Sequence, residues 1–134
     1  MIINNFQEIQ AWQKARELSI EIYKEFGGIK DFGFKDQITR ASVSVMNNIA
    51  EGFGRSSSKE FIRFLTFSKA SAIEVQSMLI LAQDLNYISK EKYTNLIKTT
   101  TETQNLIGGF INYLTQFNRK TDQPKNRRTE KPKN

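Results

Sequence analysis

The stretch of residues 37–65 constrains the fold of this chain most, because its apolar residues recur at steps of three and four. That spacing places them on one face of an α-helix and does not fit the alternating faces of a β-strand. The sequence therefore predicts a helix that ends near Phe53 and buries this face. The face consists of Ile38, Ala41, Val45, Ile49 and Gly52.

A second apolar stripe runs beside the first on the same helix. A helix with two apolar stripes needs two packing partners, or one partner and an interface with another copy of the chain. Gly52 lacks a Cβ, so another helix can approach closely there. Glu51 is expected to pair with Arg55, four residues further on, or with Arg40 of another copy. We predict an oligomer interface made of Val43, Met46, Glu51, Gly52 and Phe53.

A sharp corner is predicted after this helix. Gly54 stands where a C-terminal cap glycine is commonly found. Ser57 and Glu60 have the spacing of a capping box, which marks the start of a new helix. The sequence therefore predicts a helix, a corner and a further helix that reaches about residue 85.

Two more helices are expected from the apolar periods on either side. Asn5 is the expected N-cap of the first and Ser89 that of the last. Short connections between four helices indicate an all-α, up-down-up-down four-helix bundle over residues 1–118. The polar residues 119–134 are expected to be a disordered tail. The predicted helices span about residues 6–27, 34–53, 58–85 and 89–118.

The positive charge of the chain is unevenly distributed. The formal net charge is +6. Residues 119–134 carry seven basic and two acidic side chains, whereas residues 1–118 carry 13 basic and 12 acidic ones. A basic tail is typical of proteins that bind nucleic acid or another polyanion. A solubilising disordered end explains the same composition equally well.

The composition argues against an enzyme. The chain has no cysteine and no histidine, so it offers no thiolate or imidazole for a metal site or for nucleophilic catalysis. The motif Gly52-Phe53-Gly54 lacks the rest of a dinucleotide fingerprint. We expect no cofactor and no metal. No signal peptide and no apolar run of about 18 residues is present, so we expect a cytoplasmic protein without a membrane partner.

A basic surface is the stronger functional candidate. Arg55, Lys59 and Arg63 recur every four residues and so share one side of the corner and the following helix. Arg40 lies on the preceding helix, and Lys69 lies further along and off the line. A solvated helix face explains this spacing as well. The predicted nucleic-acid-binding residues are Arg40, Arg55, Lys59, Arg63, Lys69, Arg127 and Arg128.

Several segments together resemble a known family. They are Trp12-Gln13-Lys14-Ala15, Leu18, Tyr23, Gln37-Ile38, Arg40-Ala41, Asn48-Ile49-Ala50-Glu51-Gly52, Arg55, Ser58, Glu60-Phe61 and Phe64-Leu65. Over about residues 6–118 the chain resembles the 23S rRNA intervening-sequence proteins, a family that includes the accessory protein of diversity-generating retroelements. The chain departs from the family pattern at Thr39-Arg40, where paired arginines are common, at Met46-Asn47 and at Ala70-Ser71.

The resemblance implies a four-helix bundle that assembles into a homopentameric ring. It also implies nucleic acid as a partner and, for the retroelement protein, a reverse transcriptase, although no docking motif for that enzyme is found in the sequence. The lost arginine weakens the implied nucleic-acid binding. The leading hypothesis is therefore an oligomeric bundle that binds RNA through backbone charge. The alternative is a structural or adaptor oligomer that binds a protein partner and no nucleic acid.

Overall fold

Four long helices make up the described part of the chain. The computed structural model describes residues 2–121, with side chains up to residue 118. A short 3₁₀ helix, η1 (Phe6–Glu8), precedes α1 (Gln10–Phe26), α2 (Phe32–Phe53), α3 (Ser58–Asp84) and α4 (Lys90–Thr121). No strand occurs within residues 2–121. The prediction of an all-α protein with four helices is confirmed.

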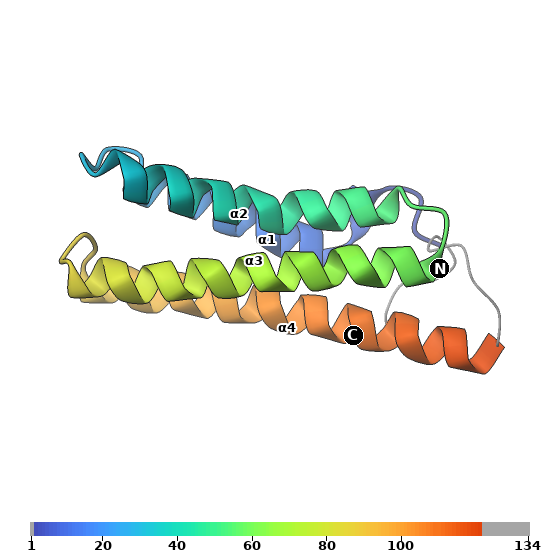
Figure 1. The fold of residues 1–134 in the computed structure, drawn as a ribbon. Coiled ribbons are helices and arrows are strands. Elements are labelled where there is room, and N and C mark those ends of the chain that lie inside the picture. The colour runs from blue at the N-terminus through green and yellow to red at the C-terminus, as the bar shows by residue number, and fades with distance from the viewer. Residues whose placement is uncertain (1, 122–134) are drawn as a thin grey trace.

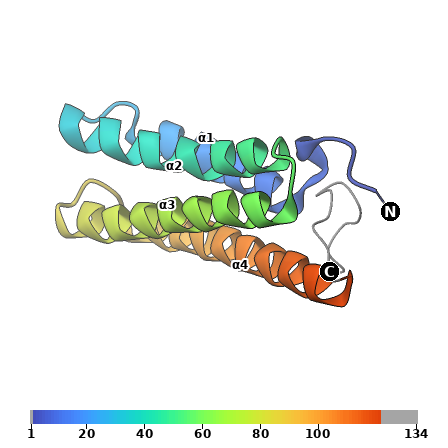
Figure 2. The same ribbon diagram turned by 45° about the vertical axis from the view of Figure 1, so that its right-hand side comes forward.

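The helices run up and down in two layers. Figures 1 and 2 show α1 and α2 in one layer and α3 and α4 in the other. Each helix packs on two neighbours, so that α2 and α4 both contact α1 and α3, whereas the diagonal pairs α1–α3 and α2–α4 make no such contact among the described residues. The bundle therefore has four lateral faces, one over each pair of neighbouring helices.

The first predicted helix is broken near its start, which corrects the expected span of residues 6–27. The Asn5 side chain does not cap a helix; its amide donates to the Glu8 carboxylate at 3.3 Å. Ile9 is extended and buried, and α1 begins after it. The break lets Phe6 fold back onto the edge of Trp12, with ring centroids 5.1 Å apart. This aromatic contact forms where the sequence predicted a helix capped by Asn5.

Polar side chains fix the ends of the later helices. Asp31 accepts a hydrogen bond from the Phe34 N–H at 3.1 Å and starts α2 two residues earlier than predicted. Ser57 accepts from the Glu60 N–H at 3.2 Å, so the predicted start of α3 is confirmed. Ser89 accepts from the N–H of Lys92 at 3.2 Å and starts α4 in the same way. These caps satisfy N–H groups that have no partner inside their helix.

Small residues line the seam between α2 and α3. The hydroxyl groups of Ser44 and Ser71 lie 2.9 Å apart across it. The buried Ser68 hydroxyl donates to the Val45 carbonyl at 2.6 Å. At Gly52 an added Cβ would lie 2.8 Å from the Phe61 ring. Large side chains at these positions would hold the helices apart, so the small residues set their separation.

The polar middle of α4 does not interrupt that helix. Its buried threonines satisfy their hydroxyl groups within the helix, because each donates to the carbonyl four residues back. Thr100 donates to Leu96 at 2.7 Å, and Thr103 donates to Thr99 at 2.7 Å. The helix runs without a break to Thr121, three residues past the predicted end of the bundle. The remainder of the predicted tail lies outside the described residues.

One helix meets a simple criterion for crossing a membrane. Within residues 2–121, α3 is long enough and reaches a mean hydropathy of 1.2 over an 18-residue window. The core helix of a bundle meets the same criterion, and α3 packs against both α2 and α4. The criterion is therefore weak evidence for a span.

The first prediction concerns the α2–α3 seam. Replacing Gly52 with Ala should destabilise the protein by about 1–3 kcal/mol, because the new methyl group overpacks the contact with Phe61 and Phe64. Gly109→Ala is the matched control: nothing lies within 4 Å of its added Cβ, so it should stabilise by about 0.5–1 kcal/mol. Urea unfolding measures both free energies, and equal effects at the two sites would contradict the role given to Gly52.

Candidate nucleic-acid interface

The corner between α2 and α3 gathers two arginines over one aromatic ring. The Arg55 guanidinium lies 4.5 Å from the ring centroid of Phe64. The Arg63 guanidinium lies 5.9 Å from the same ring and 5.2 Å from that of Phe67. The two rings meet edge to face, with centroids 5.7 Å apart. Cations at these distances are attracted to the faces of the rings. The contacts therefore restrict the positions of both arginine side chains.

Gly52 makes this arrangement possible. The Phe64 Cβ would lie only 2.8 Å from a Cβ at Gly52, so the backbone of α3 passes very close to the last turn of α2. Arg55 follows that turn directly and therefore reaches the Phe64 ring. The same close approach that packs the seam thus assembles the cationic corner, which we define as Arg55, Lys59, Arg63, Phe64 and Phe67.

Two carboxylates lie beside the arginines. Glu51 pairs with Arg55 at 3.5 Å, as the sequence predicted, and Glu60 pairs with Arg63 at 3.4 Å. These ion pairs are exposed, with 44% of the Arg55 and 59% of the Arg63 side chain accessible, so each contributes little to stability. They do lower the local charge. With Lys59 included, the corner carries three cations against two anions.

The structure does not bring the other predicted cations to this corner. Arg40 pairs with Asp36 at 2.9 Å on its own helix, and fifteen residues separate it from Arg55, which is about 22 Å along a helix axis. The Lys69 ammonium lies near Gly108 of α4, so Lys69 points to the other side of α3. Arg127 and Arg128 lie outside the described residues.

The predicted interface residues divide into two groups. The chain buries Gly52 and Phe53 itself: Phe53 is 5% exposed and packs edge to face on Phe61. These two residues therefore make their contacts within one chain. Val43 and Met46 are half-buried, and Glu51 is exposed. For these three an interface stays a prediction.

Exposed apolar side chains lie on several faces of the bundle, among them two faces that lie opposite each other. One face covers α1 and α2, whose seam is marked by the hydrogen bond from Ser19 to the Ser42 carbonyl. The other covers α3 and α4, whose seam is marked by the bond from Gln104 to Gln76. Helical spacing from these marks places Ile20, Tyr23, Val43 and Met46 on the α1–α2 face, and Ile73, Ile80 and Ile97 on the α3–α4 face.

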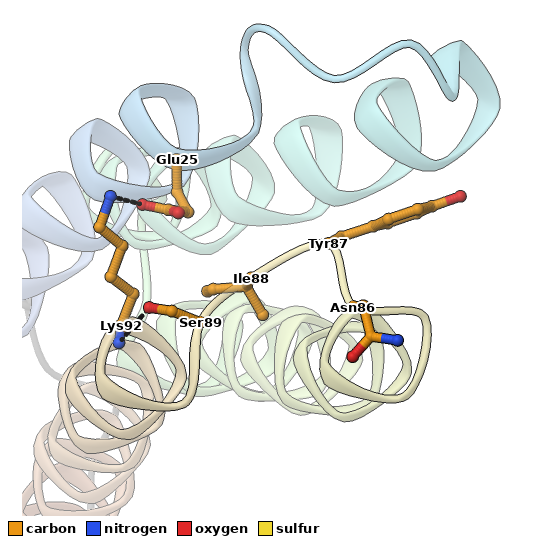
Figure 3. Close-up of a pocket in the computed structure, with 6 residues that line it drawn as sticks. All are labelled: Glu25, Asn86, Tyr87, Ile88, Ser89 and Lys92. Carbon is orange, nitrogen blue, oxygen red and sulfur yellow. Dashed lines mark hydrogen bonds and ion pairs between the residues drawn. The ribbon is translucent and has the colours of Figure 1, made fainter.

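A shallow depression lies at the opposite end of the bundle, by the turn between α3 and α4 (Figure 3). Its charges already have partners, because Lys92 pairs with Glu25 at 3.3 Å. Asn86 has a φ of 60°, the left-handed conformation that asparagine tolerates at the end of a helix. Tyr87 donates its hydroxyl to Asp31 at 2.7 Å and points along the surface. The depression is therefore part of the turn between α3 and α4, and the charged groups that line it are already paired.

No metal-binding cluster of three or more acidic side chains occurs in the described part of the chain. Sequence reasoning missed Phe67, which the structure places under Arg63. The signal was present, because Phe67 follows Arg63 by four residues and therefore lies on the same side of α3.

Comparisons with known proteins agree with this architecture. A scan against models of protein families matches residues 7–109 to the family described as 23S rRNA-intervening sequence protein. A search of the curated proteins finds no match. Among solved structures, the chain is similar to a Bacteroides thetaiotaomicron protein of unknown function from the S23 ribosomal protein family. The TM-score is 0.72 and the identity 27%, over 75% of this chain and 97% of that one.

The second prediction concerns the bond between Tyr87 and Asp31. Hydrogen bonds from the Tyr87 hydroxyl and the Phe34 N–H lower the pKa of the Asp31 carboxyl. The stabilisation this gives is present above the unfolded-state pKa and is lost as the pH falls through the lower folded-state pKa. Tyr87→Phe should therefore reduce the free energy of unfolding at neutral pH, and its difference from wild type should shrink in acid.

Urea unfolding over a pH series measures that difference. Tyr93→Phe is the matched control, because the structure gives its hydroxyl no hydrogen bond within the described residues. Its effect should not change with pH over the range in which Asp31 titrates. A Tyr87→Phe effect that is equally independent of pH would show that the hydroxyl does not act through the carboxylate.

Proposed function

Because this chain belongs to the 23S rRNA-intervening sequence protein family, we propose that it is a small homo-oligomeric four-helix protein that binds RNA through basic residues. The observation that carries the proposal is the cationic corner. Arg55, Lys59 and Arg63 project from one exposed edge, and two of them are oriented by aromatic rings. Guanidinium groups held in this way suit contacts to phosphate oxygens.

Several smaller features support the same proposal. The corner surrounds the N-terminus of α3, where the helix dipole adds positive potential. Residues 119–134 add a net charge of +5 in each copy. Contacts of this kind give affinity that depends on salt and carries no sequence information. The protein should therefore bind RNA non-specifically.

Oligomerisation is the second half of the proposal. The α1–α2 and α3–α4 faces lie on opposite sides of the bundle and both expose apolar side chains, among them Tyr23 at 53%, Ile73 at 51% and Ile80 at 46%. Opposite faces that pack on each other make a head-to-tail contact, which closes into a ring when the rotation permits. Five copies is the number that the family resemblance implies.

A ring would strengthen weak binding. Each corner alone has a small net charge, so one copy makes few phosphate contacts. Linked copies bind one strand with a high effective concentration at every site after the first. The assembly would therefore bind RNA far more tightly than a single bundle.

The alternative function is an adaptor oligomer that binds a protein and no nucleic acid, with a reverse transcriptase among the candidate partners. Two observations favour it. Residues 1–118 carry a net charge of only +1, and Glu51 and Glu60 already pair with Arg55 and Arg63. The RNA titration below separates the two functions.

The third prediction tests RNA binding. Arg55→Glu and Arg63→Glu should each weaken binding of a fluorescent RNA, because each places a carboxylate where a phosphate would lie. Each should also reduce the slope of log affinity against log salt, by roughly 0.7 for every phosphate of a single strand that the variant no longer neutralises. Fluorescence anisotropy at rising salt measures both quantities.

Two further variants complete that test. Lys98→Glu makes the same charge change on an exposed position of α4 and should alter binding much less. Truncation after Thr121 keeps α4 whole and removes five basic and two acidic residues, so it should weaken binding as well. An adaptor would lose nothing by this truncation. Absence of RNA binding by the wild type at low salt would overturn the proposed function.

The fourth prediction tests the head-to-tail ring. Val43→Glu places a charge in the α1–α2 face, and Ile80→Glu places one in the α3–α4 face. Each variant alone should therefore be monomeric. Mixed together, they retain one intact face each and should form a species of two chains that cannot extend. Light scattering after gel filtration gives the masses. An assembly of wild-type size from either variant alone, or a monomeric wild type at micromolar concentration, would contradict the ring.

A further inference from the structure

Phe67 is an exposed aromatic side chain within the cationic corner. Its side chain is 42% exposed and lies outside the buried core. Its ring and that of Phe64 are arranged edge to face, and the Arg63 guanidinium lies 5.2 Å from its ring centroid. Single exposed apolar residues are common on protein surfaces. The unusual feature here is that this exposed ring contacts one cation, Arg63, and lies on the side of α3 that also carries Lys59.

This combination is the one that binds unpaired nucleotides. Proteins that hold single strands pair a positive surface, which follows the phosphates, with aromatic rings on which bases stack. An arginine plane adds to the stack, and the contact tolerates any base because every base has a π-face. In a duplex the bases are already stacked and their faces are not available.

We propose that Phe67 and Arg63 form a stacking site for an unpaired base of single-stranded RNA, while Arg55 and Lys59 contact phosphates of the same strand. This inference rests on the proposed RNA binding and specifies the form of RNA that is bound. The site occupies the α2–α3 face, which a head-to-tail contact between the other two faces leaves open. Each copy in a ring would then present one stacking site.

The arrangement of the four side chains supports this division of roles. Lys59 and Arg63 are one turn apart on α3, about 6 Å along the helix axis. Phe67 follows one turn later, so cations and ring lie in a row along the helix. Arg55 lies beside this row, with its guanidinium over the ring of Phe64. A strand that runs along this row meets charge first and the π-face of Phe67 next.

The test compares three ligands that carry the same number of phosphates on the strand that is measured. They are an oligouridylate, the duplex of that strand with oligoadenylate, and an abasic strand of the same length. The wild-type protein should bind the oligouridylate more tightly than the abasic strand, because only the first has bases to stack. The salt concentration is held constant, so that backbone charge contributes equally to the two single strands.

Phe67→Leu removes the π-face and keeps a side chain of similar bulk. It should weaken oligouridylate binding roughly 5- to 100-fold and leave binding of the abasic strand unchanged, whereas Phe67→Tyr should restore oligouridylate binding. Phe32→Leu is the matched control. Phe32 is 70% exposed and has the Lys35 ammonium 5.2 Å from its ring centroid, but it lies at the far end of α2. This variant should bind as the wild type does.

The outcomes separate the two proposals. If the wild type binds the oligouridylate and the abasic strand equally, or if Phe67→Leu binds the oligouridylate normally, stacking is overturned and charge-based RNA binding stands. If the wild type binds none of the ligands at low salt, both are overturned. If Phe67→Leu fails to fold, the wild-type comparison of oligouridylate with abasic strand still decides the question.

Discussion

The close approach of α2 to α3 is the contact on which the rest of the molecule depends. It requires a residue without a Cβ at Gly52, because Phe61 and Phe64 fill the space that a Cβ would take. Further along the seam, the serine hydroxyl groups of Ser44 and Ser71 meet directly. Small side chains let the two backbones approach closely, and the serine hydroxyl groups form hydrogen bonds across the seam. The separation of these helices then fixes where every other helix can pack.

The cationic corner depends on the same contact. Because α3 passes so near the end of α2, the ring of Phe64 lies beneath Arg55. Arg63 reaches the same ring from α3 itself. A wider separation would move the Arg55 guanidinium away from the Phe64 ring and leave it paired only with Glu51. The core and the cationic corner are thus not independent, and a change at Gly52 should disturb both.

Much of this fold was accessible from the sequence, because helical period and capping residues are local signals. Ser57 caps the start of α3 and Gly54 stands at the C-cap of α2, as expected from such signals. The period shows that Phe53 is buried but does not show by what, which is why an interface was predicted where Phe61 of the same chain packs. The break before α1 was not predicted, because no local pattern indicates the contact between Phe6 and Trp12 that accompanies it.

A head-to-tail ring leaves the α1–α4 and α2–α3 faces of each bundle uncovered, and these two faces carry different charges. The α1–α4 seam is lined by carboxylates, with Glu102 and Glu17 both near Lys14, and Glu21 beside Thr99. Burial and the neighbouring Glu17 raise the pKa of Glu21, as expected where negative charge is crowded. The α2–α3 face carries the arginines instead. In a head-to-tail ring these two faces would form opposite surfaces of the assembly. The α2–α3 surface would attract a polyanion and the α1–α4 surface would repel it. RNA bound as we propose would then lie along the surface that carries the arginines, where the proposed stacking sites of successive copies would act together.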